Sequence, residues 1–292
     1  MILLDGRQTS AKIKEEIAAT VSQMKQQNQR VPHLAAVLVG MDGASMTYVG
    51  AKVRACELVG FDSTLIELPE DASERELLNQ IKALNNNPDI DGFIVQLPLP
   101  KHIDDQKILM AIAPNKDVDG FHPVNVGRLT LDLPTFISAT PYGIMELLER
   151  YDISTSGKHV VVIGRSHIVG RPMSILMSQK RKAGNATVTV AHSRTTNLEA
   201  LTKKADIVIA ALGIPKFLTA EMVKNDAVVI DVGITRVDDP SKKKGYRIVG
   251  DVDFESVSKK ASHITPVPGG VGPMTIAMLL KNTLLARKGL KD

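Results

Sequence analysis

Hydrophobic and polar positions alternate along the whole chain in the manner of parallel α/β proteins. Short apolar runs, several of which stop at a glycine, predict buried strands at residues 33–40, 61–68, 91–97, 158–163, 186–191, 205–213 and 227–233. Helices are predicted at 8–29, 45–59, 73–84, 104–113, 140–150 and 274–285. Ser73 and Glu76 stand at the spacing of a helix capping box, and residues 114–127 are expected to form a loop.

The order of these segments predicts two domains. The chain has 292 residues, which is enough for two modest α/β domains. The helix that begins at Thr140 and Pro141 is expected to cross to the second domain, whose first strand starts at Lys158. The apolar segment at 274–285 is expected to return and pack on the first domain.

Composition argues against several classes of protein. Aromatic residues make up 3% of the chain and Trp is absent, which argues against a base-stacking surface for single-stranded nucleic acid. The seven histidines show no metal-ligand spacing, and no apolar run approaches the length of a membrane span. A single cysteine, Cys56, favours a reducing compartment, and the N-terminus turns polar too soon for a signal peptide. We therefore expect a cytoplasmic protein with no metal, no nucleic acid and no membrane partner.

A phosphate-binding turn is predicted after the strand at 158–163. The β-branched run stops at Gly164, and the sequence GRSHIVGRP (164–172) then leads into a helical pattern. A glycine turn lets the backbone approach a pyrophosphate, and a helix start offers free N–H groups. The candidate cofactor-binding residues are Gly164, Arg165, Ser166, Ile168 and Val169. Because Ser166 replaces the middle glycine of the usual fingerprint, an ordinary strand–helix turn remains an alternative.

The end of the next strand favours NADP over NAD. NAD-binding sites commonly place an acid there, whereas this chain has His192-Ser193-Arg194-Thr195. Ser193, Arg194 and Arg165 could hydrogen-bond or pair with a 2′-phosphate. The alternative is that Arg194 is an ordinary surface arginine. Later strands end at Gly213 and Gly233, which are expected to face the cofactor, with Gly233 and Ile234 at its nicotinamide end.

Polar residues in the first half of the chain predict a second site. Tyr48 and Lys52 are four residues apart on a predicted helix, so both project from one face. Gln96 follows an apolar strand, where an unpaired buried amide costs about 1–3 kcal/mol. Asp117 and Asp119 lie in the loop that follows. Each has a simpler interpretation: a packing pair for Tyr48 and Lys52, a backbone bond for Gln96, and turn caps for the two acids.

Seven segments together resemble one enzyme family. They are YVGAK (48–52), VQLPLP (95–100), KDVDGFHP (116–123), GRSHIVGRP (164–172), HSRT (192–195), IDVGI (230–234) and TPVPGGVGPMT (265–275). In this order the chain resembles the bifunctional methylenetetrahydrofolate dehydrogenase/methenyltetrahydrofolate cyclohydrolase family. The resemblance implies NADP-dependent oxidation of 5,10-methylenetetrahydrofolate to the methenyl cation, then hydrolysis to 10-formyltetrahydrofolate.

The resemblance also implies roles for individual residues. Lys52 occupies the catalytic lysine position, Gln96 would orient it, Tyr48 would line the folate ring, and Asp119 would bind the pterin N–H groups. The substrate would also contact Val95 and Leu97, which flank Gln96, and the interdomain loop at Pro268, Gly269 and Gly270. Ala139 departs from the family pattern, since many relatives carry cysteine there, and it offers no chemistry.

The expected fold is an N-terminal α/β catalytic domain plus a Rossmann-like NADP-binding domain, with an interdomain cleft. The catalytic, folate-binding domain would comprise residues 1–139 and a C-terminal helix at 273–292, and the NADP-binding domain residues 140–272. The family implies a homodimer that acts on tetrahydrofolate one-carbon derivatives and supplies purine biosynthesis. A dehydrogenase with little cyclohydrolase activity and a non-catalytic nucleotide-binding protein remain alternatives.

Overall fold

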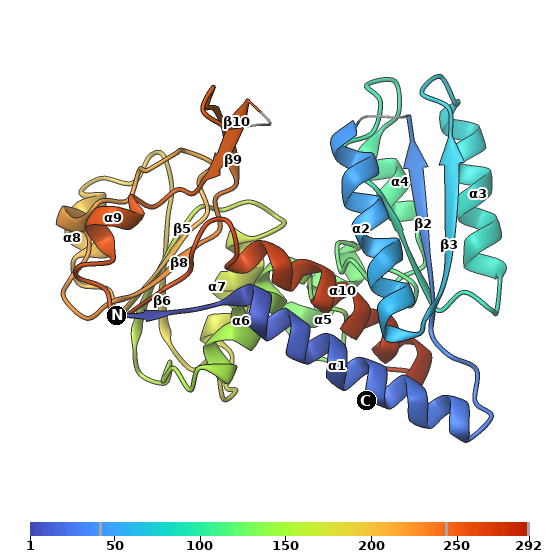
Figure 1. Cartoon of the computed structure of the whole chain (residues 1–292), viewed down its shortest axis with the longest axis horizontal. Helices are drawn as coiled ribbons and strands as arrows, with labels where there is room; N and C mark the ends of the chain where they lie inside the picture. Colours follow the sequence, from blue (N-terminus) through green and yellow to red (C-terminus); the bar gives the residue numbers. More distant parts are fainter. Residues whose placement is uncertain (41–42, 243–244, 291–292) are drawn as a thin grey trace. The chain divides into compact units, whose positions relative to one another are not determined.

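The computed structural model describes residues 1–40, 43–242 and 245–290 and divides into two compact units (Figure 1). Unit 1 contains Met1–Ser10 and Thr140–Thr275. Unit 2 contains Ala11–Ala139 and the residues from Ile276 onward. Both units are built on parallel strands, as the alternating pattern predicts.

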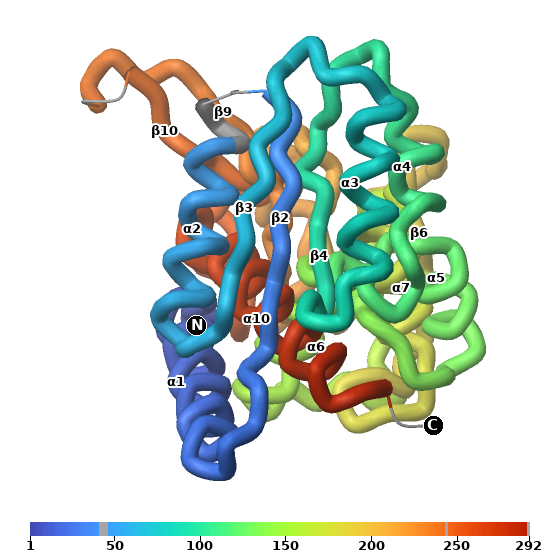
Figure 2. Tube along the Cα trace, turned by 90° about the vertical axis from the view of Figure 1, so that its right-hand side faces the viewer, coloured from blue at the N-terminus to red at the C-terminus, as the bar shows by residue number. Residues whose placement is uncertain are grey.

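Unit 2 contains three parallel strands in the order β3 (Asp62–Leu68), β2 (His33–Val39) and β4 (Gly92–Val95) (Figure 2). The central strand β2 is buried along nearly its whole length, because it has a strand on each side and helices above and below. Val37 in β2 pairs with Ile66 in β3 and Val95 in β4. The carboxyl ends of all three strands therefore lie at the same edge.

Helices cover both faces of this sheet. The helices α2 (Gly43–Val59) and α3 (Glu74–Asn86) lie on opposite sides of the strands in Figure 1. One core is shared by α3, α4 (Asp105–Ala111) and the side chains on one face of β2 and β4. The predicted capping box at the start of α3 is confirmed, with Ser73 and Glu76 each bonding the backbone of the other.

Unit 1 contains a six-stranded parallel sheet. Its order is β1 (Ile2–Leu3), β11 (His263–Ile264), β8 (Val228–Asp231), β7 (Ile207–Ala210), β5 (His159–Ile163) and β6 (Thr187–Ala191). The chain leaves β5 to form β6 on one side and then crosses over to form β7 on the other. Such a reversal opens a crevice at the carboxyl ends of the strands, where α/β proteins bind ligands.

The remaining elements connect these sheets. In chain order they are α1 (Gly6–Gln26), α5 (Pro123–Thr130), α6 (Ala139–Arg150), α7 (Gly170–Ser178), α8 (Leu198–Thr202), η1 (Ala220–Met222), β9 (Thr235–Asp238), β10 (Tyr246–Val249), α9 (Phe254–Val257) and α10 (Val271–Lys288). The strands β9 and β10 form a separate antiparallel pair.

The first ten residues differ from the expected domain boundaries. We expected them to belong with the rest of 1–139, but they group with unit 1. The reason is that β1 pairs in parallel with β11 at the edge of the six-stranded sheet. A two-residue strand has too little sequence for any periodicity to reveal it. At the other end, α10 begins at Val271, and the division between units falls inside it, after Thr275.

The expected loop at 114–127 was wrong in its second half, where α5 begins at Pro123. Proline suits the first helical position because its fixed φ is helical and the missing N–H would have no partner there. The side chain of His122 caps the same end, since its Nδ1 accepts a hydrogen bond from the Val124 N–H at 3.1 Å.

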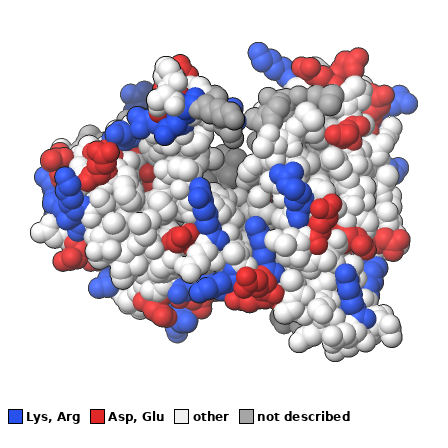
Figure 3. Space-filling model, in the orientation of Figure 1, with Lys and Arg blue, Asp and Glu red and all other residues white. Residues whose placement is uncertain are grey.

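Acidic and basic side chains are interspersed on the face of the molecule drawn in Figure 3.

Within the described part of the chain, none of the helices has both the length and the hydrophobicity that crossing a bilayer requires. The same residues contain no group of three or more His, Cys, Asp or Glu side chains placed to hold a metal ion. Several buried polar groups, among them Asp231 and Thr265, lie instead where strands end.

Candidate functional site

A buried lysine lies near the carboxyl end of β4 in unit 2. Lys52, on α2, is 8% exposed, and its Nζ donates a hydrogen bond to Gln96 Oε1 at 3.1 Å. The same Nζ lies 5.0 Å from the centre of the Tyr48 ring, one helical turn earlier. The structure thus brings Gln96 to Tyr48 and Lys52, which come from a different segment of the sequence.

Gln96 is held as a hydrogen-bond acceptor toward Lys52. Its backbone N–H bonds Val37 O at 2.9 Å, which ties the residue to the sheet, and its Nε2 donates to Leu97 O at 2.6 Å. The amide therefore bonds both the backbone and the lysine. Because Nε2 is committed to a carbonyl, Oε1 is the atom left to face Lys52. Val95, before it, is buried, and Leu97, after it, is half-buried.

Burial shifts the protonation of both charged groups in this cluster. It lowers the pKa of Lys52, because an ammonium removed from water loses solvation, while the Asp119 carboxylate opposes that shift. Burial likewise raises the pKa of Asp119, and the Lys52 charge opposes that rise. A neutral amine is therefore more accessible at Lys52 than at a lysine in solvent.

The two acids of the following loop have different surroundings. Asp117 is 2% exposed, and its Oδ2 accepts hydrogen bonds from the His122 N–H at 2.7 Å and Asn125 Nδ2 at 2.8 Å. Burial raises the pKa of Asp117 to about 6 despite these bonds. The interpretation as a turn cap thus holds for Asp117, whereas Asp119 is the acid that interacts with Lys52.

Two buried asparagines bind this loop, and the sequence analysis missed both. Asn125, 1% exposed, bonds Asp117 as well as Pro114 O. Asn282, also 1% exposed, donates to Val118 O at 2.8 Å and Ile137 O at 2.9 Å. The available signal for Asn282 was a polar residue inside the apolar segment at 274–285.

In unit 1, the predicted turn after β5 is tightly packed. Gly164 has φ +132°, and a Cβ there would lie 2.3 Å from Ala211 O. A Cβ on Gly170, the first residue of α7, would lie 2.1 Å from Gly164 O. Only glycines fit these two positions, as a nucleotide-binding turn requires.

The start of α7 corrects one detail of the expectation. We expected its N–H groups to be free, but Ser166 Oγ accepts hydrogen bonds from the Val169 N–H at 3.1 Å and the Gly170 N–H at 3.4 Å. Ser166, at the position of the usual middle glycine, therefore bonds the backbone just before α7 and at its first residue. Arg165 and Ile168, in the turn itself, are exposed.

The end of β6 presents its polar residues beside this turn. Ile163 pairs with Ala191, and the Gly164 N–H bonds Ala191 O at 2.9 Å, so Arg165 and residues 192–195 leave neighbouring strand ends. His192 Nδ1 accepts from the Arg194 N–H at 3.1 Å, which shapes the turn. Ser193 and Arg194 are exposed, and neither Arg165 nor Arg194 forms an ion pair with another described residue.

The ends of β7 and β8 are held by two buried carboxylates that the sequence analysis did not select. Asp251 Oδ2 accepts a hydrogen bond from the Gly213 N–H at 2.9 Å, and Asp231 Oδ1 accepts from the Gly233 N–H at 2.9 Å. Asp231 Oδ1 also accepts from the Asp251 N–H at 2.8 Å, which links the two turns. Burial raises the pKa of Asp231 to about 6.

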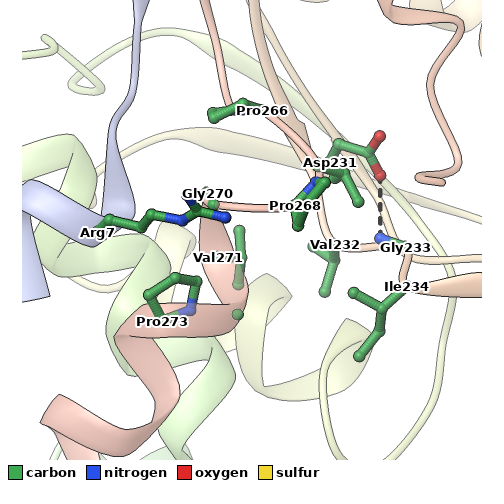
Figure 4. A pocket seen from close by; sticks show the side chains of 13 residues that line it. Arg7, Asp231, Val232, Gly233, Ile234, Pro266, Pro268, Gly270, Val271 and Pro273 are labelled. Carbon is green, nitrogen blue, oxygen red and sulfur yellow. Dashed lines mark hydrogen bonds between the residues drawn. The ribbon is translucent and has the colours of Figure 1, made fainter. Parts of the chain in front are cut away.

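A pocket of about 430 Å³, part of it open to solvent, lies next to the second of these turns (Figure 4). Its lining comes from the end of β8, the segment after β11, the first turn of α10, and Arg7 of α1. Figure 4 shows Arg7 beside Gly270, and the Asp231 carboxylate turned toward the Gly233 N–H. Of the predicted residues, this pocket joins Gly233 and Ile234 with Pro268, Gly269 and Gly270.

These observations fit the cofactor that the sequence implies. The glycine turn after β5 admits backbone only, and the turn after β6 has no acid that would repel a 2′-phosphate. Two exposed arginines, Arg165 and Arg194, leave the same edge of the sheet and could pair with that phosphate. The residues present therefore suit NADP.

Comparisons with known proteins agree with the geometry of both units. Residues 4–119 match the tetrahydrofolate dehydrogenase/cyclohydrolase catalytic domain, and residues 138–290 match the NAD(P)-binding domain of the same family. A protein of Flavobacterium psychrophilum called bifunctional protein FolD is 68% identical over 291 residues, which cover 100% of this chain and 99% of that one.

Solved structures give the same result. The bifunctional FolD enzyme from Campylobacter jejuni, a methylenetetrahydrofolate dehydrogenase/cyclohydrolase, has a TM-score of 0.92 and 49% identity, covering 99% of both chains. The Trypanosoma brucei dehydrogenase-cyclohydrolase, solved with NADP cofactor and an inhibitor, has a TM-score of 0.92 and 40% identity, covering 99% of this chain and 97% of that one. The chain therefore belongs to the tetrahydrofolate dehydrogenase/cyclohydrolase family.

Proposed function

We propose that this protein oxidises 5,10-methylenetetrahydrofolate with NADP⁺ and hydrolyses the resulting methenyl cation to 10-formyltetrahydrofolate. The observation that carries the proposal is the contact between buried Lys52 and Gln96 Oε1, with Asp119 beside them. This is the arrangement that the hydrolytic half of the reaction needs. Membership of the family supports both halves.

Lys52 acts as the base in the hydrolysis. Burial lowers its pKa, and a bound cationic substrate would lower it further by charge repulsion. The oxygen of water bonds to the methenyl carbon, and the proton of that water passes to the neutral amine. The bond from this carbon to N5 then breaks as the hydroxyl proton of the adduct is transferred to N5, which leaves the formyl group on N10, and the proton on Lys52 is released to solvent. Gln96 Oε1 accepts a hydrogen bond from Lys52 Nζ and so fixes the direction of the lone pair on that nitrogen.

The oxidation needs positioning more than acid–base chemistry. When bound, NADP⁺ accepts a hydride from the methylene carbon, and no proton moves in that step. The protein's part is to hold the reacting atoms in line. We assign Asp119 to the pterin N–H donors, which a carboxylate suits, and Tyr48 to the folate ring. Val95 and Leu97 would line the substrate beside Gln96, and Pro268, Gly269 and Gly270 would contact it from unit 1.

The cofactor is assigned to the edge of the unit 1 sheet. Its pyrophosphate would lie on the backbone of residues 164–169, and its 2′-phosphate on Ser193, Arg194 and Arg165. Gly213 and Gly233 would let the backbone approach the cofactor, with Ile234 at its nicotinamide end. The fixed glycine turns and the exposed arginines support this assignment.

Three broader properties belong to the same proposal on the strength of the family resemblance. We infer a homodimer, a cytoplasmic location, and a role in supplying one-carbon units to purine biosynthesis. Sedimentation equilibrium of the purified protein tests the first of these. A single species with the mass of one chain, 31.6 kDa, would contradict it.

Replacing the lysine tests the hydrolysis directly. In Lys52→Met, hydrolysis of added methenyltetrahydrofolate should fall by at least about a hundredfold, the contribution typical of a general base. NADP binding, measured by calorimetry, should stay unchanged. The matched control is Lys82→Met, the same change at an exposed lysine of α3.

A second assay on the wild-type protein follows NADPH and the methenyl intermediate together. With both activities, the intermediate should stay low while NADPH rises. Accumulation of the intermediate in step with NADPH would indicate a dehydrogenase with little cyclohydrolase activity. Absence of NADPH formation would indicate a non-catalytic nucleotide-binding protein.

A further inference from the structure

The side chain of Asn282 joins two separate segments of unit 2. It lies on α10 and is 1% exposed. Its Nδ2 donates one hydrogen bond to Val118 O at 2.8 Å and another to Ile137 O at 2.9 Å. One amide nitrogen thus uses both of its hydrogens on carbonyls from segments that are far apart from it in sequence.

The hydrogen bond to Val118 O fixes the orientation of Asp119. Val118 O belongs to the peptide group that joins Val118 to Asp119, so fixing this oxygen fixes the plane from which the Asp119 side chain departs. Val118 itself is fully buried, and a Cβ on Gly92 would lie 2.2 Å from its Cγ1. The backbone before Asp119 is therefore held by packing on one side and by Asn282 on the other.

The second carbonyl lies against the residue after Asp119. Gly120 has φ +72°, and a Cβ there would lie 2.9 Å from the carbonyl carbon of Ile137 and 2.8 Å from the Ser138 N. The turn that carries Asp119 is thus in close contact with residues 136–138. By bonding both Val118 and Ile137, Asn282 fixes the spacing between these two segments.

The amide is an unusual choice for this buried position. Asn282 Oδ1 is buried and has no hydrogen-bond partner among the described residues. Leucine has the same branching at Cγ without an unpaired oxygen, but it would leave both carbonyls without a donor. An aspartate at this position would place a carboxylate against two carbonyl oxygens. Asparagine is short and neutral, and its amide nitrogen supplies the two hydrogen-bond donors that this position needs.

We propose that Asn282 is a positioning residue for the folate substrate, acting through the Asp119 carboxylate. This inference rests on the role proposed above for Asp119. Asn282 itself need touch neither substrate nor cofactor. Its contribution is to keep the turn of Val118, Asp119 and Gly120 in the one place from which the carboxylate can bind the pterin beside Lys52.

The test compares Asn282→Ala with Thr283→Val. Thr283 is also fully buried on α10, but its Oγ1 donates to Leu279 O of the same helix, so among the described residues its replacement removes no hydrogen bond to the Asp119 turn. In Asn282→Ala, KM for methylenetetrahydrofolate should rise about tenfold, because small displacements of binding groups are costly. The Kd of NADP should stay unchanged. Thr283→Val should change the thermal midpoint but neither of these constants.

A double-mutant cycle with Asp119→Asn separates positioning from general loss of structure. If Asn282 acts through Asp119, most of the KM increase caused by Asn282→Ala should vanish in the Asp119→Asn background. A full increase in that background, or an unchanged KM in Asn282→Ala alone, overturns the inference. Should Asn282→Ala fail to fold, Asn282→Ser retains one donor, and the same cycle with it gives the same decision.

The cycle also distinguishes this inference from the proposed function. If Asp119→Asn alone leaves KM unchanged, the substrate-binding role of Asp119 is wrong and the inference falls with it. Loss of hydrolysis in Lys52→Met would still support the catalytic assignment in that case. If Asp119→Asn raises KM but Asn282→Ala does not, only the inference about Asn282 fails.

Discussion

Asp117 and Asp119 show how strongly surroundings decide what a carboxylate does. They are two residues apart in one loop, yet Asp117 accepts hydrogen bonds from the His122 N–H and from Asn125 on α5, whereas Asp119 interacts with Lys52. The sequence could nominate both acids as candidates. It could not tell them apart, because the difference lies in contacts with Asn125 and Lys52 that only the folded chain creates.

The buried carboxyl of Asp117 makes stability depend on pH. The pKa of its carboxyl is about 6 in the folded protein, against 3.8 for an aspartate in water, so between pH 4 and 6 the folded state binds more protons than the unfolded state. Its contribution is therefore most favourable below pH 4 and is lost as pH rises through 6. Two pKa units correspond to about 2–3 kcal/mol.

Asp117→Asn should remove this dependence while an amide oxygen can still accept the hydrogen bonds of Oδ2. The measurement is urea unfolding of the wild type and the variant at several pH values from 4 to 7. The free energy of unfolding of the wild type should fall relative to that of the variant as pH rises over this range. A constant difference would contradict the raised pKa.

At the scale of elements, the residues assigned to the cofactor lie in the turns that follow parallel strands. The sequence predicted the ends of β5, β7 and β8 from apolar runs that stop near glycines, since buried parallel strands are nearly all apolar. It did not predict Asp251 as the residue that holds Gly213, because that bond joins residues 38 apart. Hydrogen bonds between residues far apart in the chain produce no periodic pattern in the sequence.

The turn after β6 should determine the choice of cofactor. In Arg194→Ala, KM for NADP should rise about tenfold or more, because a hydrogen bond to a charged group contributes about 1.5–3 kcal/mol. KM for NAD, which lacks the 2′-phosphate, should change little. Arg247→Ala, at an exposed arginine of β10, is the matched control. Equal effects on both cofactors would remove Arg194 from the phosphate site.

Short or irregular elements were the ones that sequence patterns missed. The strand β1 has two residues, and α5 begins at a proline inside a segment rich in turn residues. Helices with a clear capping signal, such as α3, were placed within two residues of their observed ends. The length of an element therefore decided whether the sequence could predict it, because hydrophobic periodicity is recognisable only over several repeats.

At the scale of the whole molecule, neither unit is a continuous piece of chain. The chain passes between units inside α1, at the start of α6 and inside α10. The sequence predicted the return of the C-terminal segment from chain order. It did not predict that the first ten residues belong to unit 1.

Two matched core substitutions test this division. Leu280 on α10 and Leu218 are both fully buried, the first in unit 2 and the second in the core of unit 1. Each change to alanine should cost about 2–5 kcal/mol. Hydrogen exchange should then increase in β2 and β4 for Leu280→Ala and in β7 and β8 for Leu218→Ala. Uniform increases through both units would show that they unfold as one.

The place of Asn282 in the chain has a consequence for synthesis on the ribosome. Asp119 is made early, but the side chain that holds its turn follows only after residues 140–275 have been added. At about 5–20 residues per second, this interval lasts on the order of ten seconds. By the end of that interval, before Asn282 is added, the nascent chain already contains every segment of unit 1. The proposed folate site, in contrast, still lacks part of its support, so we expect it to be the last part of the protein to mature.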